Sequence, residues 1–335
     1  MRFELGQRII DKIRKPFIRV KIKEIERIKE VDEHFKLKEL IDVYNNLLYD
    51  EYSRETYLNV LQYRLNSKFK IKSALPTPSN QTLNSITNEY GDKFEVFNGS
   101  WTFEAKELNL SPLGANLRFY GDPLYVYYTT NQYSYKNDGV DIDVKDGDVV
   151  IDGGGCYGDT ALWFAHKIGK SGKVYSFEFV KKNLDIFHKS LNLNPHLKNR
   201  IKIVNAALYS VSESSLYVCE NGAGTFCSAD KDIIVGGGDN YTIKTKAIDD
   251  LVRDEKLNKV HFIKMDIEGS ELEALKGAKN TIQQYKPNLA ICIYHKIEDF
   301  YMIPKYIKEI VPDYKLCVKH HTDGLAETVL YASIK

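Results

Sequence analysis

From about residue 146 to the C-terminus, the sequence alternates between short apolar segments and amphipathic segments. The apolar segments have the length of buried strands, and the amphipathic segments repeat their apolar residues at helical spacing, as where "GDVVIDGG" precedes "DTALWFAHKIG". This alternation predicts an α/β fold with a doubly wound, mostly parallel sheet. The last two apolar segments, "YKLCVKH" and "ETVLYASI", are joined by a short turn region, which predicts an antiparallel strand at one edge of the sheet.

The sequence before residue 146 divides into two further regions. Residues 1–90 are expected to form a mainly helical N-terminal region, with isoleucines repeating at helical spacing between residues 18 and 28. Residues 91–145 are expected to form short strands and connectors, rich in Tyr and Phe, that pack on the domain formed by residues 146–335. This strand-rich region includes "DPLYVYYTTNQYSY".

Composition limits the partners and the compartment. Among 335 residues, 47 Lys and Arg nearly balance 46 Asp and Glu, so a net charge of +1 gives no reason to expect nucleic acid as a partner. No apolar run approaches the roughly 20 residues of a membrane helix, and the start lacks the apolar core of a secretion signal. A basic excess in the first 30 residues leaves a peripheral membrane contact open, although a solvated helical face is favoured. Five scattered cysteines fit a reducing cytoplasm, and nothing predicts the oligomeric state.

A glycine-rich turn follows the first predicted strand of the sheet. In "VVIDGGGCYGDT", Gly153, Gly155 and Gly158 have the spacing of a loop whose backbone approaches a bound cofactor closely. Glu178 ends the next predicted strand, 20 residues after Gly158, where an acidic side chain binds the ribose hydroxyls of an adenosine. NAD-dependent and S-adenosylmethionine-dependent enzymes share this arrangement, so it predicts an adenosine-bearing cofactor without choosing between them.

The charges beside the glycines favour one of the two cofactors. Asp152 precedes the glycines and Asp159 follows them, so two carboxylates would crowd a pyrophosphate at the start of the next helix. S-adenosylmethionine instead carries a sulfonium and an ammonium group, which carboxylates attract. The loop therefore favours S-adenosylmethionine, and a Rossmann-type NAD-dependent oxidoreductase is the alternative.

A second acidic motif follows the fourth predicted strand. In "FIKMDIEGSELEALKGA", Asp266 and Glu268 come directly after the strand. Ligands of doubly wound sheets bind at the carboxyl ends of the strands, so Asp266 is expected to face the same crevice as the glycine turn. A cap of the following helix is the alternative role for Asp266. Glu271 and Glu273 are expected to be solvated helix charges.

Histidines near the predicted strand ends are candidates for chemistry. His295 follows the fifth strand, beside the expected position of Asp266, and an imidazole suits a general base; a structural role is the alternative. His320 and His321 follow the next-to-last strand and are expected at the substrate entrance, although loop histidines are common. Asp266, Glu268 and His295 could together hold a divalent cation, but no adjacent pair of aspartates follows the fifth strand. We therefore expect Asp266, Glu268 and His295 to be catalytic without a metal.

Residues 146–295 resemble the FkbM-type methyltransferases. The resemblance is carried by "VVIDGGGCYGDT", "KVYSFEF", "IVNAAL" and above all by the run from Lys264 to Ala278, which is present in full. It implies a Rossmann-like methyltransferase fold and S-adenosylmethionine as the cofactor. Many members of this family O-methylate sugars or natural products.

The resemblance also assigns roles to individual residues. Glu178 matches the acid that binds the ribose, and Asp266 matches the acid near the methyl group. Phe179 departs from the proline that many relatives have after the ribose-binding acid, which bears on the shape of the adenosine pocket. The segment expected beside the adenine comprises Asn205, Ala206 and Ala207, and the segment expected at the methionine part comprises Asp152, Gly153, Gly154, Gly155, Cys156, Tyr157, Gly158, Asp159 and Thr160.

These observations predict an S-adenosylmethionine-dependent O-methyltransferase. Family resemblance alone favours a hydroxyl of a sugar, a sugar nucleotide or a polysaccharide precursor as the acceptor. "DEYSRETYLNVLQYRL" and "YGDPLYVYY" are similar to the leader of bacterial members that act in surface-polysaccharide pathways. A catalytically inactive binding subunit of such a pathway, with the same fold, is the alternative from another functional class.

Overall fold

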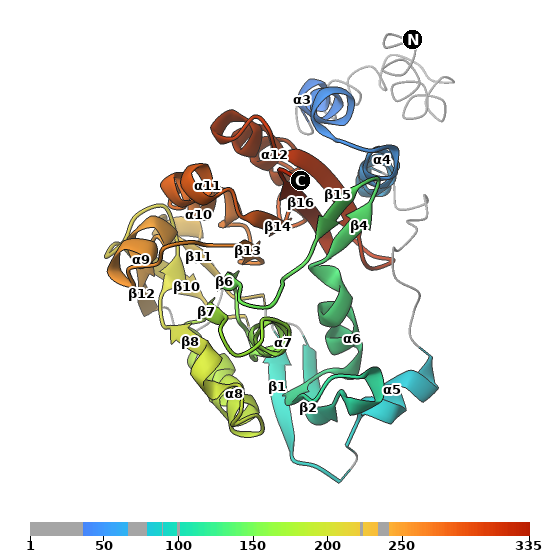
Figure 1. Cartoon of the computed structure of the whole chain (residues 1–335), viewed down its shortest axis with the longest axis vertical. Helices are drawn as coiled ribbons and strands as arrows, with labels where there is room; N and C mark the ends of the chain where they lie inside the picture. The colour runs from blue at the N-terminus through green and yellow to red at the C-terminus, as the bar shows by residue number, and fades with distance from the viewer. Residues whose placement is uncertain (1–35, 66–78, 89, 99–100, 222–223, 234–240) are drawn as a thin grey trace.

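The structure is a computed structural model that describes residues 36–65, 79–88, 90–98, 101–221, 224–233 and 241–335 (Figure 1). The isoleucine repeat between residues 18 and 28, and the basic excess of the first 30 residues, lie outside the described residues. Within the described part of the chain, no helix is long and apolar enough to cross a membrane. The predicted division of the chain at residues 90 and 145 stays a prediction.

A seven-stranded sheet forms the centre of the molecule. Its strands lie in the order β15 (Lys315–His320), β16 (Thr328–Ser333), β14 (Asn288–Cys292), β13 (Phe262–Met265), β6 (Val149–Gly153), β7 (Lys173–Phe177) and β8 (Ile201–Val204). The pairs from β14 to β8 are parallel, and β16 runs antiparallel to both of its neighbours. The predicted α/β fold with a mostly parallel sheet is confirmed. The antiparallel strand itself lies one position inside the edge, because β16 inserts between β14 and β15.

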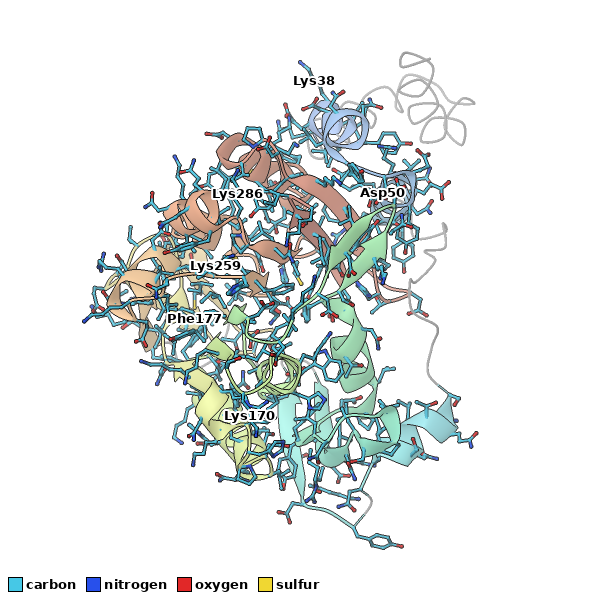
Figure 2. All side chains as sticks on the ribbon, viewed as in Figure 1. Lys38, Asp50, Lys170, Phe177, Lys259 and Lys286 are labelled. Carbon is cyan, nitrogen blue, oxygen red and sulfur yellow. The ribbon has the colours of Figure 1, made fainter. Side chains whose placement is uncertain are left out.

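Two cores, one on each face of the sheet, hold the fold together. Neighbouring residues of a strand point to opposite faces, so Phe262 enters one core and Ile263 the other. Helices α9 (Ile248–Asp254), α10 (Glu271–Lys276), α11 (Lys279–Tyr285) and α12 (Asp299–Ile310) cover one face; α7 (Asp159–Lys167) and α8 (Lys181–Asn192) cover the other (Figure 1). Phe177 lies inside, whereas Lys38, Lys170, Lys259 and Lys286 reach solvent (Figure 2).

In "SELEALKGAKNTIQQY", residues 270–285, apolar side chains repeat at helical spacing and predict one helix, but the segment is divided into α10 and α11. The division falls at Gly277, where a side-chain carbon would lie only 2.3 Å from the carbonyl oxygen of Tyr209. The close approach of a neighbouring backbone therefore interrupts a segment whose apolar spacing continues. Leu275, Ala278 and Ile282 are buried, as their spacing predicts.

Residues 36–65 form α3 (Leu37–Asp42), the π-helix η2 (Val43–Leu47) and α4 (Glu51–Leu65), which pack on the β15 edge of the sheet and on α12. After a gap, α5 (Asn80–Ile86) packs instead against α6 (Pro123–Gln132) and the turn at Ser111–Leu113. Leu48 makes a parallel bridge to Leu316 of β15, and the Ser53 hydroxyl accepts a hydrogen bond from the backbone nitrogen of Val318. Backbone groups that an edge strand would otherwise present to solvent are thus used within the chain.

The segment between the N-terminal helices and β6 contains a helix that the sequence analysis missed. Strands β1 (Lys93–Asn98), β2 (Trp101–Asn109) and β3 (Arg118–Gly121) form a small sheet, and β4 (Tyr135–Asn137) pairs with β5 (Val140–Ile142). Residues expected as strands and turns form α6 (Pro123–Gln132) instead. The Asp122 carboxylate accepts a hydrogen bond from the Leu124 nitrogen, and proline suits the first helical position. The Asp-Pro pair was the overlooked signal.

A second small sheet lies between β8 and β13 in the sequence. It has the order β11 (Phe226–Ser228), β10 (Ser215–Cys219), β12 (Tyr241–Lys246) and β9 (Ala207–Leu208). The predicted strand that ends in "IVNAAL" is therefore divided, with β8 in the central sheet and β9 in this second sheet.

Candidate active site

A cavity of about 370 Å³ opens where β6, β7 and β13 end. Parallel strands place their carboxyl ends at one edge of the sheet, and this is where doubly wound folds bind ligands. The volume lies in the usual range for small-molecule pockets. Residues from β3, α6 and the turn before β16 complete the lining, including Tyr120, Gln132, Tyr133, Ala326 and Glu327.

The glycine turn forms one wall of this cavity through its backbone. Gly154 has a φ of 82°, and a side-chain carbon there would lie 1.9 Å from the carbonyl oxygen of Asp266. The nitrogens of Gly154 and Gly155 both donate to the Phe177 carbonyl, which fixes the turn against the end of β7. The residues of the turn that line the cavity are Gly154, Cys156, Tyr157, Asp159 and Thr160.

Asp152 lies beneath this wall and does not line the cavity. It is fully buried, accepts hydrogen bonds from the hydroxyls of Thr160 and Ser176, and pairs with Lys264 Nζ at 3.3 Å. Lys264 Nζ also donates to the carbonyls of Gly153 and Gly154, at 3.0 and 2.8 Å. Asp152 therefore positions the turn through Lys264, which corrects its predicted contact with the cofactor. Gly153, Gly155 and Gly158 likewise act through the backbone and do not line the cavity.

Glu178 lies at the end of β7, in the cavity wall. Its Oε1 accepts hydrogen bonds from the backbone nitrogens of Phe179 and Val180, and its Oε2 accepts one from Asn183 Nδ2 at 3.2 Å. Burial raises the pKa of Glu178 to about 7, although these three bonds favour the charged form. Phe179, Ala206 and Ala207 line the same wall, whereas Asn205 is exposed and lies outside it. The part predicted for Asn205 beside an adenine is thus not supported by its position.

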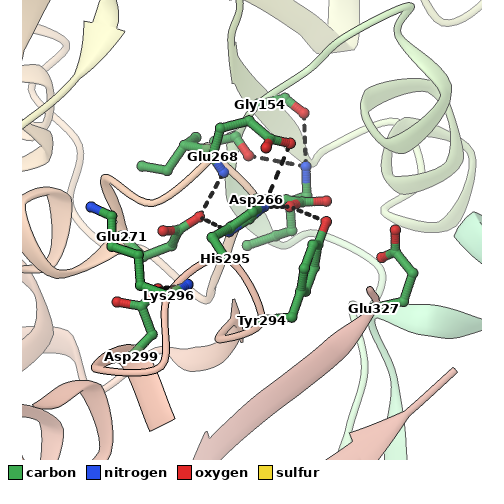
Figure 3. A network of polar contacts seen from close by, with 12 residues as sticks. Gly154, Asp266, Glu268, Glu271, Tyr294, His295, Lys296, Asp299 and Glu327 are labelled. Atoms are coloured by element: carbon green, nitrogen blue, oxygen red, sulfur yellow. Dashed lines mark hydrogen bonds and ion pairs between the residues drawn. The ribbon is translucent and has the colours of Figure 1, made fainter. Parts of the chain in front are cut away.

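Carboxylates and two tyrosines, Tyr133 and Tyr294, gather at the other end of the cavity. Figure 3 shows Asp266, Glu268, Glu327 and Tyr294 there. The hydroxyls of Tyr294 and Tyr133 donate to the two oxygens of Asp266, at 3.0 and 3.2 Å. Burial raises the pKa of Glu327 to about 8, and the charge of Asp266 adds to this effect. Glu268 also lines this end of the cavity and has a φ of 55°. The structure thus brings Asp266 and Glu268 together, as the sequence predicts.

His295 lies beside Asp266, as predicted, but behind the cavity wall. Its Nε2 is 3.4 Å from Asp266 Oδ1 and 3.5 Å from Glu268 Oε1, and its Nδ1 is 3.0 Å from Glu271 Oε1 (Figure 3). Burial lowers the pKa of His295, but the three carboxylates, Glu271 foremost, outweigh burial and raise it to about 11. An imidazole in this setting keeps its proton at neutral pH. The predicted role of His295 as general base is therefore corrected.

Glu271, His320 and His321 also lie elsewhere than predicted. Glu271 is fully buried rather than solvated, and it accepts a hydrogen bond from the Ile267 nitrogen. His320 and His321 are fully buried, contact Thr328 Oγ1 and the Tyr331 hydroxyl at 2.8 and 2.9 Å, and do not line the cavity. Burial lowers the pKa of both rings, to about 4 and about 3, so both are neutral. Their predicted contact with substrate is replaced by a role in the core.

Several cavity residues escaped the sequence analysis. Gln132 ends α6, Tyr133 follows it directly, and Glu327 comes from the turn before β16. Tyr294 precedes His295 directly, and its position just after a predicted strand was a usable signal. Nothing in the local sequence of Glu327 marks it, because its neighbours in the cavity are far away along the chain.

The fold and the cavity define a Rossmann-like methyltransferase. The family model of the Methyltransferase FkbM domain matches residues 141–311, about half of the chain, so this chain belongs to the FkbM methyltransferase family. The family decides between the methyltransferase and the NAD-dependent oxidoreductase that the glycine pattern left open. A comparison with curated proteins found no match to the sequence.

One solved structure with the same fold is that of a family member. The FkbM methyltransferase of Methylobacillus flagellatus is similar, with a TM-score of 0.56 and 21% identity over 92% of this chain and 60% of that chain. This chain thus spans less than two thirds of that relative. Two further structures have a TM-score of 0.36 and 11% identity. They are Aeropyrum pernix fibrillarin with bound S-adenosyl-L-methionine (72% of this chain, 99% of that chain) and a Bacillus cereus O-methyltransferase with SAH (63% and 78%).

Proposed function

We propose that this chain transfers the methyl group of S-adenosylmethionine to a hydroxyl group, with a sugar, a sugar nucleotide or a polysaccharide precursor as the acceptor. The charge of the cavity is the observation that carries the choice of cofactor. Among the described residues that line it, six are acidic and one, Lys264, is basic, so acidic side chains still dominate when Glu327, with its pKa of about 8, is protonated. Lys264 is itself paired with Asp152. Such a cavity attracts the sulfonium and ammonium groups of S-adenosylmethionine and disfavours the pyrophosphate of NAD.

The two ends of the cavity suit the two ends of this cofactor. Glu178 sits where the ribose hydroxyls of an adenosine would donate to a carboxylate, with Phe179 and Ala206 beside it. Asp159 begins α7 and also lines the cavity, where its carboxylate would attract the ammonium group of the cofactor. The methyl group then points toward the end of the cavity that holds Asp266, Glu268 and Glu327.

The acidic end also suits a hydroxyl acceptor. Methyl transfer is an in-line displacement, so its rate depends on holding the acceptor oxygen in line with the carbon–sulfur bond. As the new carbon–oxygen bond forms and the carbon–sulfur bond breaks, the hydroxyl proton leaves to one acceptor, a carboxylate at this end of the cavity or a water molecule that carries it to solvent. A saccharide offers several hydroxyls to carboxylates and to the tyrosines Tyr133 and Tyr294. Family resemblance supports the saccharide, and all five cysteines are free thiols, which supports a reducing compartment such as the cytoplasm.

Ligand-induced stabilisation tests the cofactor, and turnover tests the reaction. At a hundredfold excess over its Kd, S-adenosylhomocysteine should raise the free energy of unfolding by about 2.7 kcal/mol and so raise the melting temperature. NAD at equal concentration should leave the melting temperature unchanged. Labelled methyl groups from S-adenosylmethionine should then appear on an ether oxygen of a saccharide acceptor. Stabilisation by NAD alone would refute the proposed cofactor. Binding of S-adenosylhomocysteine without transfer to any saccharide panel would favour the inactive binding subunit.

A further inference from the structure

We propose that Asp266, Glu268 and His295 form a binding site for a divalent first-row transition-metal cation at the acceptor end of the cavity. The inference deepens the proposed function and rests on it for the role of the metal, but not for the existence of the site. One oxygen of Asp266, one of Glu268 and a ring nitrogen of His295 lie within 4.8 Å of one another.

The distances between these atoms fit a shared ion. His295 Nε2 lies 3.4 Å from Asp266 Oδ1 and 3.5 Å from Glu268 Oε1. Nitrogen and oxygen ligands stand about 2.0–2.2 Å from small divalent cations, so two ligands of one ion are roughly 3.0–3.5 Å apart. The three side chains therefore need little movement to bind one cation together.

The imidazole is directed at this position, and its Nε2 faces the Asp266 and Glu268 carboxylates. The side chain of His295 is 8% exposed, and its Nε2 makes no hydrogen bond to any of the described residues. A buried ring nitrogen without a hydrogen bond is costly, and a metal ion would satisfy it. On the other side of the ring, Glu271 Oε1 lies 3.0 Å from Nδ1 and is held by the Ile267 nitrogen at 2.8 Å. A carboxylate behind a ligating histidine is the usual arrangement that fixes the ring toward a metal.

Charge and donor type indicate which cation fits. Two carboxylates balance the charge of a divalent ion, and the buried carboxylate of Glu271 adds to the negative field. One imidazole with two carboxylates suits ions such as Mn²⁺ better than Ca²⁺ or Mg²⁺, which prefer oxygen ligands.

The site opens toward the proposed acceptor. Asp266 and Glu268 line the cavity, while His295 lies behind them, so the free coordination positions of the ion face the cavity. Hydroxyl groups of a saccharide would occupy those positions, and a bound cation lowers the pKa of a hydroxyl that it coordinates. The metal would therefore both orient the acceptor and make its oxygen a better nucleophile.

Direct measurement of Mn²⁺ binding tests the site without any acceptor. The full chain, dialysed against EDTA and then against buffer, is titrated with Mn²⁺, and free Mn²⁺ is read by electron paramagnetic resonance. We expect one saturable site per chain. Pulsed measurements of bound Mn²⁺ should show coupling to a ¹⁴N nucleus of the His295 ring, which adventitious binding to surface carboxylates would not give.

Three variants distinguish a specific metal site from nonspecific binding of Mn²⁺ to acidic side chains. Glu268→Gln keeps the size of a half-buried side chain and should weaken Mn²⁺ binding at least tenfold, whereas Glu273→Gln, on α10 outside the cluster, should bind like the unmodified chain. Thermal unfolding confirms that each variant is folded. His295→Gln should remove the ¹⁴N coupling. The absence of saturable binding, a normal affinity of Glu268→Gln, or bound Mn²⁺ without ¹⁴N coupling would overturn the site.

The same experiments keep the two proposals apart. Methyl transfer that persists in EDTA, in a chain that binds no Mn²⁺, would refute the metal site and leave the proposed function intact. Saturable Mn²⁺ binding without stabilisation by S-adenosylhomocysteine would refute the proposed function and leave the metal site intact.

Discussion

We propose that Glu178 binds the ribose of the cofactor, and its pKa should then make cofactor binding depend on pH near neutrality. Burial raises this pKa to about 7, and the charged carboxylate accepts hydrogen bonds from ribose hydroxyls more strongly than the neutral acid, which also loses part of its acceptor capacity to the proton. Above the pKa the site is ready to bind, and below it binding must first remove a proton. Between pH 8 and pH 6 the ionised fraction falls from roughly nine-tenths to roughly one-tenth, so the Kd of S-adenosylhomocysteine should rise about tenfold.

The Glu178→Gln variant isolates the charge. Hydrogen bonds to charged groups contribute about 1.5–3 kcal/mol and those between neutral groups about 0.5–1.5, so the variant should lose about 1–2 kcal/mol of binding, roughly 5- to 30-fold. Its affinity should no longer change between the two pH values. Titration calorimetry at both pH values is the assay, with Asp185→Asn on the exposed side of α8 as the control. An affinity of the unmodified chain that is equal at both pH values would refute the reasoning, as would normal binding by Glu178→Gln.

Two further predictions concern the support beneath the glycine turn. Lys264→Met leaves the buried Asp152 without its cation and should destabilise the fold by about 3–5 kcal/mol in chemical denaturation. Combined with Asp152→Asn, the loss should be smaller than the sum of the single losses, and additive losses would show that the pair is not coupled. Gly154→Ala places a carbon 1.9 Å from the Asp266 carbonyl, whereas Gly139→Ala has a similar φ of 77° and open space. Gly154→Ala should therefore cost about 1–3 kcal/mol more than Gly139→Ala, from the clash alone, and should abolish binding of S-adenosylhomocysteine; equal losses would contradict this.

The central sheet could be predicted from the sequence because its signal is local. Each strand is a short apolar run, and each covering helix shows its own buried face. Parallel strands end at one edge, so the positions of Glu178, Asp266 and Glu268 in the sequence were enough to predict a shared site. Position 154 requires glycine because the backbone carbonyl of Asp266 lies too close for a side chain. The sequence shows the glycine but does not show that Asp266 is its neighbour.

What the sequence could not supply is the environment of each side chain. Nothing local shows that three carboxylates surround His295, so its resting proton could not be foreseen. His320 and His321 look like loop residues, but β16 enters the sheet beside β15 and buries both. Glu271 lies among the polar residues of a helix start, and only the packing of α10 turns it toward His295.

The residues that line the cavity come partly from inside and partly from outside the segment that the family model matches, and several of those from outside lie at the proposed acceptor end. The residues around Glu178 and the glycine turn come from within 141–311, the segment that the family model matches. Gln132, Tyr133 and Glu327 come from outside that segment, and the Gln132 side chain donates to the Glu327 carboxylate. Enzymes that share a cofactor can share the residues that bind it. Residues that select the acceptor must differ between enzymes without affecting the residues that bind the cofactor. We therefore expect substitutions at Gln132 and Glu327 to change which acceptor is methylated. The affinity for S-adenosylhomocysteine should change by no more than about twofold, because the effects of substitutions at independent sites deviate by only about 0.5 kcal/mol. An equal loss of affinity for the cofactor and for every acceptor would show instead that these residues serve the whole cavity.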